Sequence, residues 1–183
     1  MTLGERLVAL HEALLAADVP HAFGGAIALG FSTPEPRSTR DIDVNVFLPA
    51  ERASVVLAAL PAGVRVEEDT LDRILRDEQI RLWWDDTPVD LFFDYDPIHA
   101  QARRNVMRVP YEGTTIDVLG PVELAVFKAV FNRSRDWPDI EEMVRGEALD
   151  VAAVRASLNQ MFSPDDERFA RLDEAVRNAT DRP

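Results

Sequence analysis

Two aspartates interrupt a run of residues that otherwise has the composition of a buried strand, in the segment RSTRDIDVNVF. Side chains two apart in a strand point to the same face, so Asp41 and Asp43 share one face while Ile42, Val44 and Val46 take the other. Like charges at this spacing repel each other, and aspartate is a poor strand former. Paired carboxylates suit a divalent metal ion, although a strand with one solvent-exposed face gives the same alternation.

A third acid, Asp90, stands within the apolar segment TPVDLFF. If its strand pairs near the strand of Asp41 and Asp43, three carboxylates converge and provide enough oxygen ligands for one or two magnesium ions. A single buried aspartate that caps a neighbouring turn is the alternative. Because the chain has no cysteine, thiolate metal sites are excluded and carboxylates and three histidines remain as ligands.

Gly24 and Gly25 lie between a short apolar segment and a run of small residues, sixteen positions before Asp41. Glycines between a strand and a helix let a phosphate approach backbone N–H groups, and the helix N-terminus favours negative charge. A close-packed turn would use two glycines equally well.

Lysine is nearly absent from the chain, since 19 of the 20 basic residues are arginine and Lys128 is the exception. A compact, flexible ammonium kept within LAVFKAVF indicates a position where a planar guanidinium would not serve, with a surface lysine as the alternative. If the helix continues, Asn132, Arg135 and Asp136 follow Lys128 at i+4, i+7 and i+8 and form one polar stripe. A solvent-facing stripe would have the same spacing.

The elements that would position these side chains follow from hydrophobic periodicity and from turn residues. Helices are expected at 4–19, 26–31, 51–60, 70–79 and 97–105. Strands are expected at 20–23, 41–47 and 64–68, and in two hairpins, 80–93 turning at Asp85 to Pro88 and 106–119 turning at Glu112-Gly113. A loop broken by Pro34 and Pro36 precedes the strand of Asp41 and Asp43.

Beyond residue 120 the sequence predicts helices alone, at 121–133, 137–146, 150–162 and 163–179, with Pro121 and Pro164 in first turns. The fold class is therefore α+β. We expect a catalytic domain at 1–119 and a C-terminal helical region at 120–183 packed on it.

The composition is that of an ordinary protein of one domain or slightly more, with 183 residues and 46% hydrophobic residues. A net charge of −13 argues against a protein that coats nucleic acid, although it does not exclude a local basic patch. No apolar run approaches about 18 residues, and the N-terminus lacks the features of a signal peptide. The expectation is a cytoplasmic protein that does not bind membranes.

The order strand, Gly-Gly, helix, loop, strand with Asp-x-Asp and later strand with Asp resembles the nucleotidyltransferase superfamily typified by DNA polymerase beta. GGAIALGF, followed by RSTRDID and later by FKAVFNRSRDWPDI, resembles the AbiEii-type nucleotidyltransferase toxins, which include the mycobacterial MenT group. The resemblance spans about Phe23 to Ile140. It implies the nucleotidyltransferase fold, a mixed twisted sheet with flanking helices, followed here by a C-terminal helical bundle.

The resemblance also implies roles for the glycines and the acids. Gly24 and Gly25 match the motif that cradles the triphosphate, where many members of the superfamily have Gly-Ser. Asp41 and Asp43 match the metal-binding pair. Asp90 matches the third acid, which binds metal and can activate the attacking hydroxyl.

Three further positions follow from the same resemblance. Lys128 matches a later basic residue that holds a phosphate, and Arg40, directly before the first metal-binding aspartate, is assigned to the nucleotide site. Asp136 matches an acid typical of the toxin subgroup, with a role that the residues themselves do not define.

The implied activity is transfer of a nucleoside monophosphate from an NTP to an acceptor hydroxyl, with two magnesium ions and release of pyrophosphate. The toxin resemblance points to RNA, above all transfer RNA, as acceptor and to a separate antitoxin as partner. Strong acidity instead suits a small cationic acceptor such as an aminoglycoside-type antibiotic. A non-catalytic nucleotide-binding module is the third possibility.

Overall fold

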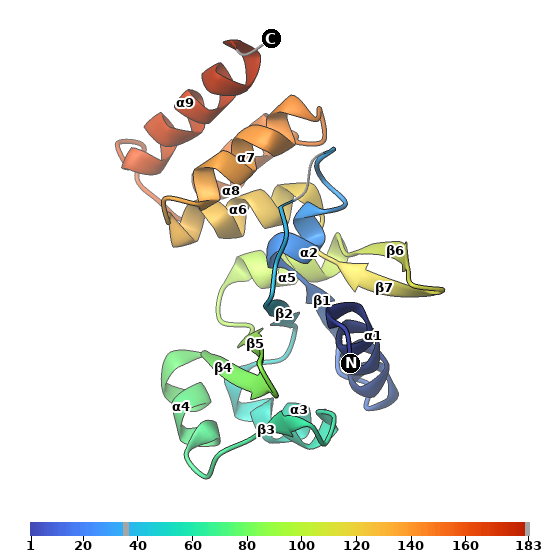
Figure 1. Ribbon diagram of the computed structural model, residues 1–183. Helices are drawn as coiled ribbons and strands as arrows, with labels where there is room; N and C mark the ends of the chain where they lie inside the picture. Colours follow the sequence, from blue (N-terminus) through green and yellow to red (C-terminus); the bar gives the residue numbers. More distant parts are fainter. Residues whose placement is uncertain (35–36, 182–183) are drawn as a thin grey trace. The chain divides into compact units, whose positions relative to one another are not determined.

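The computed structural model describes residues 1–34 and 37–181 (Figure 1). Glu35 and Pro36, which belong to the expected loop, lie outside the described residues. The chain divides into two compact units, one formed by residues 1–27 and 38–119 and the other by residues 28–37 and 120–183. A short segment from the N-terminal half therefore groups with the C-terminal helices.

The first unit is organised around a mixed seven-stranded sheet in the order β3-β4-β5-β2-β1-β7-β6. Its strands are β1 (His21–Phe23), β2 (Ile42–Val46), β3 (Val64–Arg65), β4 (Gln79–Trp84), β5 (Thr87–Phe92), β6 (Met107–Tyr111) and β7 (Thr114–Val118). Strands β2 and β5 are parallel, as are β1 and β7, whereas the other neighbours are antiparallel. The expected mixed sheet is confirmed.

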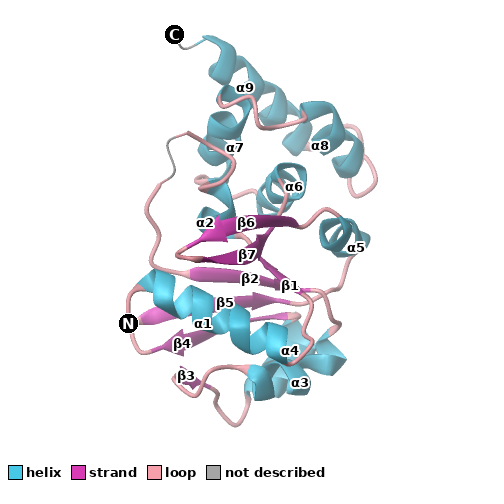
Figure 2. Cartoon of the chain, turned by 90° about the vertical axis from the view of Figure 1, so that its right-hand side faces the viewer, coloured by secondary structure: helices cyan, strands magenta, loops and turns pink. Residues whose placement is uncertain are grey.

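Helices accompany the sheet at its faces and edges (Figure 2). They are α1 (Leu3–Ala16), α2 (Gly25–Leu29), the 3-10 turn η1 (Ala50–Arg52), α3 (Ala53–Ala59), α4 (Thr70–Asp77) and α5 (Pro97–Arg104). A capping box starts α1, because the Thr2 hydroxyl accepts from the Glu5 amide while the Glu5 carboxylate accepts from the Thr2 amide. Helix α1 lies along one face of the sheet and buries Leu7, Leu10 and Leu14 completely.

The alternation of side chains in β2 determines which face of the sheet packs against the core. Ile42, Val44 and Val46 are fully buried, as are Val89 and Leu91 on the neighbouring strand β5. Because side chains of paired residues point to the same face, the intervening polar residues of β2 and β5 are brought together on the opposite face. The apolar residues of these strands thus fix where the acids point.

Two hairpins form as predicted, with one difference in the first turn. Strands β4 and β5 pair so that Trp84 lies opposite Thr87, and the connection contains only Asp85 and Asp86. The predicted four-residue turn was wrong because Pro88 lies within the strand. In the second hairpin Glu112 and Gly113 both have positive φ, 44° and 83°, as a tight two-residue turn requires.

The second unit is helical, with α6 (Pro121–Phe131), α7 (Asp136–Arg145), α8 (Val151–Leu158) and α9 (Glu167–Asp181). Helix α7 runs beside α9, and α6 packs with α7 and α8 (Figure 1). A mixed sheet with flanking helices, followed by C-terminal helices, is the predicted fold class and is confirmed. Across the described residues, the helices are too short or too polar to cross a membrane.

The helices of this unit form as predicted but differ in their boundaries, and α8 ends at Leu158 instead of residue 162. Helix α6 ends at Phe131, and Asn132 adopts the left-handed conformation with φ 54°, so the predicted polar stripe running to Asp136 does not form. Asparagine tolerates this conformation, which terminates the helix. Helix α9 begins at Glu167, so Pro164 precedes the helix instead of occupying its first turn.

Candidate active site

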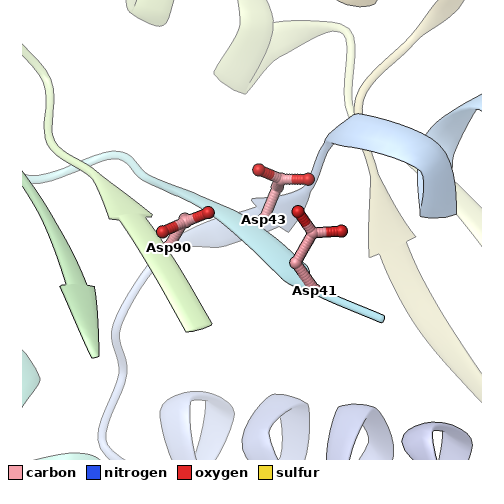
Figure 3. Close-up of side chains that lie close together, drawn as sticks. All are labelled: Asp41, Asp43 and Asp90. Atoms are coloured by element: carbon pink, nitrogen blue, oxygen red, sulfur yellow. The ribbon is translucent and has the colours of Figure 1, made fainter. Parts of the chain in front are cut away.

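Asp41, Asp43 and Asp90 converge on one face of the sheet (Figure 3). Asp43 lies directly opposite Asp90 in the parallel register of β2 and β5, and Asp41 stands immediately before β2. Each of the three carboxylates offers one oxygen atom, and these atoms lie within 4.8 Å of one another. The predicted convergence is therefore observed.

The carboxylate of Asp41 is oriented by its own loop. The Thr39 hydroxyl donates to Oδ1 of Asp41, and the backbone amide of Asp41 donates back to that hydroxyl at 3.3 Å. Such local side-chain bonds fix a loop conformation just before a strand. The hydroxyl of Thr39 thus fixes the side-chain orientation of Asp41 just before β2.

Gly25 lets the chain pass directly beside the Asp43 carboxylate. Its φ is +51°, and a Cβ atom placed on it would lie 1.8 Å from Oδ2 of Asp43. Any other residue would therefore meet both a strained backbone and an overlap with the acid. Glycine at this position is a condition for the acid cluster.

Gly24, which was predicted together with Gly25 to cradle phosphate through backbone N–H groups, contacts the neighbouring strand β2. Its amide donates to the carbonyl oxygen of Asp43 at 2.9 Å. A Cβ atom on Gly24 would lie 2.6 Å from Nδ2 of Asn45, which is buried on β2. The two glycines thus pack β1 tightly against the acid-bearing strand, and their phosphate-binding role stays a prediction.

Arg81 on β4 is a member of the site that the sequence analysis did not identify. It lies opposite Asp90 in the antiparallel register, and its Nε and Nη2 atoms donate to the two carboxylate oxygens at 2.8 and 2.6 Å. The hydrogen bond to Asp90, together with the charges of Asp90, Asp41 and Asp43, raises the pKa of Arg81 above its ordinary value. The row Asp43, Asp90, Arg81 therefore crosses three strands.

The donor set fits a magnesium ion. Magnesium binds carboxylate oxygen at about 2.1 Å in octahedral geometry, so oxygens on opposite sides of one ion lie about 4 Å apart. The spread of 4.8 Å among the three oxygens therefore requires only small side-chain adjustments. Three carboxylates with one nearby guanidinium keep a net negative charge, which favours divalent cations.

Arg40 and Lys128 were predicted to bind the nucleotide. Arg40 is exposed in the loop directly before Asp41. Lys128 belongs to the second unit, where it is 4% exposed and donates to Oδ2 of Asp139 at 2.5 Å. This burial excludes the alternative of a surface lysine, while phosphate binding by Arg40 and Lys128 stays a prediction.

Asp136 takes part in the same buried ion cluster. One of its oxygens lies 3.9 Å from the Lys128 ammonium, and the other accepts from the amide and Nε of Arg133. Asp139 also accepts from Arg37 at 3.1 Å. This cluster connects residues 28–37 with α6 and α7, and a catalytic role for Asp136 stays a prediction.

Solved structures with the same fold include several nucleotidyltransferases. ANT(2'')-Ia in complex with adenylyl-2''-tobramycin matches with a TM-score of 0.56 at 15% identity, covering 99% of this chain and 98% of that one. A nucleotidyltransferase-like protein from Paracoccidioides brasiliensis gives 0.50 at 14%, covering 93% and 92%. The lincomycin-bound lincosamide adenylyltransferase LnuA gives 0.51 at 12%, covering 76% and 94%.

At these identities the likeness establishes the nucleotidyltransferase fold. No protein-family model and no curated protein matches the chain.

Proposed function

We propose that this protein is a magnesium-dependent nucleotidyltransferase that moves a nucleoside monophosphate from an NTP to an acceptor hydroxyl. The carrying observation is the convergence of Asp41, Asp43 and Asp90 on one face of a sheet with the nucleotidyltransferase fold. Carboxylates at this separation provide the oxygen ligands that magnesium prefers.

Asp41, Asp43 and Asp90 would hold the metal. Bound magnesium polarises the α-phosphate and neutralises charge on the leaving pyrophosphate. The acceptor oxygen attacks the α-phosphorus, the bond from that phosphorus to the bridging oxygen breaks, and pyrophosphate leaves with the electron pair. The hydroxyl proton passes to the Asp90 carboxylate, which lies in register with Asp43.

Arg81 positions Asp90 in this scheme. Its two hydrogen bonds occupy one lone pair on each carboxylate oxygen, and a carboxylate can accept further bonds on the remaining lone pairs. Gly24 and Gly25, Arg40 and Lys128 are assigned to the triphosphate. The support for them is their match to the superfamily motifs.

RNA is the acceptor that we propose first, with transfer RNA as the class that the resemblance to AbiEii-type and MenT toxins implies. The protein would then act as the toxin of a toxin–antitoxin system and have a cognate antitoxin as partner. The support is the sequence FKAVFNRSRDWPDI, which includes Lys128 and Asp136.

A small cationic antibiotic is the second candidate acceptor. A net charge of −13 would attract such a molecule, and two structures of similar fold carry an adenylylated aminoglycoside and a lincosamide. A module that binds nucleotide without turnover is the third reading, for which the absence of the Gly-Ser serine is the support.

The test is label transfer from each of the four NTPs, labelled at the α-phosphate, in the presence of magnesium. Total RNA, tobramycin and lincomycin are offered as separate acceptors, with Asp41→Ala as control. Label in RNA supports the toxin reading, and label in a drug supports the antibiotic reading. NTP binding without transfer to any acceptor, including cell extract, would contradict the enzyme and support the binding module.

A further inference from the structure

A small basic pocket adjoins the acid cluster in the first unit. It has a volume of about 110 Å³, and its charged lining consists of Arg65, Arg73, Arg81 and Glu67. Arg81 is the same residue that binds Asp90, so the pocket and the acid cluster share a side chain. In a chain with 33 acidic and 20 basic residues, three arginines around one pocket mark a local reversal of charge.

The register of the sheet makes the pocket continuous with the acid face. Arg81 lies opposite Asp90, and Trp83, two residues further along β4, lies opposite Arg65. Residues two apart in a strand share a face, so Arg81 and Trp83 point to the same side as Asp90. A ligand that extends from the acids along this face reaches Trp83 and Arg65.

Arg65 and Arg73 are available for a ligand because their present partners are neutral or exposed, whereas Arg81 is already bound to Asp90. Arg65 donates to the backbone carbonyl of Asp85 at 3.0 Å, which leaves its charge uncompensated by that bond. Arg73 pairs with Glu67 at 3.6 Å and with Asp69 at 3.9 Å, and the side chains of these two acids are 74% and 63% exposed. Exposed pairs of this length contribute little and yield to a phosphate.

Trp83 adds an aromatic surface beside these charges. It is 44% exposed, whereas its neighbour Trp84 on the opposite face is 5% exposed. An exposed tryptophan next to arginines matches the pattern of sites for single-stranded nucleic acids, in which arginines bind phosphates and a base stacks on the ring.

We propose that Arg65, Arg73, Arg81 and Trp83 form the acceptor subsite and that it binds single-stranded RNA, with a phosphate between the arginines and a base on Trp83. This proposal rests on the proposed function for the identity of the neighbouring site. The pocket is too small for a whole ligand and fits one group of a longer one. Its positive charge disfavours a cationic antibiotic at this position.

The test measures binding of a fluorescently labelled single-stranded RNA of about 12 nucleotides, in magnesium without NTP. The variants are the double substitution Arg65→Gln/Arg73→Gln and Trp83→Leu. Arg76→Gln is the matched control, because Arg76 lies on the same helix as Arg73 but is 68% exposed and paired with Asp77. NTP affinity is measured in every variant.

The proposal predicts about 10-fold or greater loss of RNA affinity in the double variant and about 5-fold or greater loss in Trp83→Leu. The slope of log affinity against log salt should flatten by about 0.7 in the double variant, since the contact with the one phosphate in the pocket is lost. The Arg76→Gln control and the NTP affinities should stay at wild-type values.

RNA affinity equal to wild type in both variants would overturn the proposal. A loss of NTP affinity in place of RNA affinity would assign the pocket to the nucleotide and overturn it as well. If the proposed function is wrong, the result is different. Label transfer would then be the same in Asp43→Asn as in the wild-type protein, whatever the RNA affinities of the pocket variants.

Discussion

The guanidinium of Arg81 donates hydrogen bonds to both carboxylate oxygens of Asp90, at 2.8 and 2.6 Å, across the β4–β5 pair. The positively charged guanidinium is thus bound to Asp90, which is also one of the three expected metal ligands. Arg81 and a metal ion consequently compete for the charge of Asp90, and the strength of this pair should govern metal affinity.

Replacing Arg81 with leucine is expected to tighten Mn²⁺ binding by about 5- to 10-fold. The guanidinium repels a second cation, and because its side chain is 51% exposed the effect is reduced by solvent. Titration of Mn²⁺ by electron paramagnetic resonance measures it. Arg108→Leu is the matched control, since Arg108 pairs with Asp117 in the same cross-strand arrangement on β6 and β7. Weaker Mn²⁺ binding in Arg81→Leu would contradict the prediction and show that the positioning of Asp90 by Arg81 matters more for metal affinity than the repulsion between Arg81 and the metal.

Gly25→Ala is expected to abolish Mn²⁺ binding and to destabilise the fold by more than the strain of positive φ alone. That strain is about 1–2 kcal/mol, and the overlap with Oδ2 of Asp43 adds to it. Gly113→Ala separates the two effects, because Gly113 has φ +83° with nothing within 4 Å of its Cβ position. Equal stability losses and intact Mn²⁺ binding in both variants would refute a packing role for Gly25.

The loss of Lys128 is expected to destabilise the second unit by about 3 kcal/mol. Lys128→Met would leave the buried carboxylates of Asp136 and Asp139 without its ammonium. Denaturant unfolding measures the loss, which the second substitution Asp139→Asn should partly restore. Unchanged stability would contradict the structural role of Lys128. NTP affinity, measured in the same variants, tests its separate assignment to the triphosphate.

Histidine titration should make the protein less stable in mild acid. His21 Nδ1 lies 2.8 Å from the carbonyl oxygen of Val19 and His21 Nε2 lies 2.9 Å from His11 Nδ1, so these two facing ring nitrogens cannot both carry a proton without repulsion. Burial lowers the pKa of His11, His21 and His99 below the ordinary value of 6.5.

The sign of the effect follows from proton binding. Below pH 6.5 the histidines of the unfolded chain bind more protons than those of the folded protein, whose pKa values are lower. The free energy of unfolding therefore falls as the pH drops from 6.5 to the pKa values of the folded protein. NMR titration of the three imidazoles measures these values directly. An imidazole of the folded protein that titrates at or above 6.5 would disprove the prediction for that residue.

Much of the site was predictable because strand alternation constrains it. The spacing of Asp41 and Asp43 among buried aliphatic residues indicated their shared face, and the composition of TPVDLFF indicated Asp90. The pairing of Arg81 with Asp90 was also predictable, since a hairpin with only Asp85 and Asp86 in its turn places these two residues opposite each other. The four-residue turn assumed instead would pair Trp84 with Val89 and would therefore place Trp83 opposite Asp90.

Tertiary contacts account for what the sequence did not predict. The left-handed Asn132 ends α6 and breaks the helical continuity on which the stripe from Lys128 to Asp136 depended. Asp139 binds Lys128 from the next helix, and no local pattern indicates this pairing. The grouping of residues 28–37 with the C-terminal helices likewise depends on long-range contacts.

The rate of magnesium-dependent label transfer in Asp43→Asn is the most direct test of the central claim, compared with wild type and Asp117→Asn. Asp117 is the matched control, since it also lies within a strand and pairs with an arginine, outside the acid cluster. Asp43→Asn should lower the rate by about 100-fold or more while Asp117→Asn retains it. Equal rates in Asp43→Asn and wild type would contradict the assignment of the three carboxylates as the catalytic metal site.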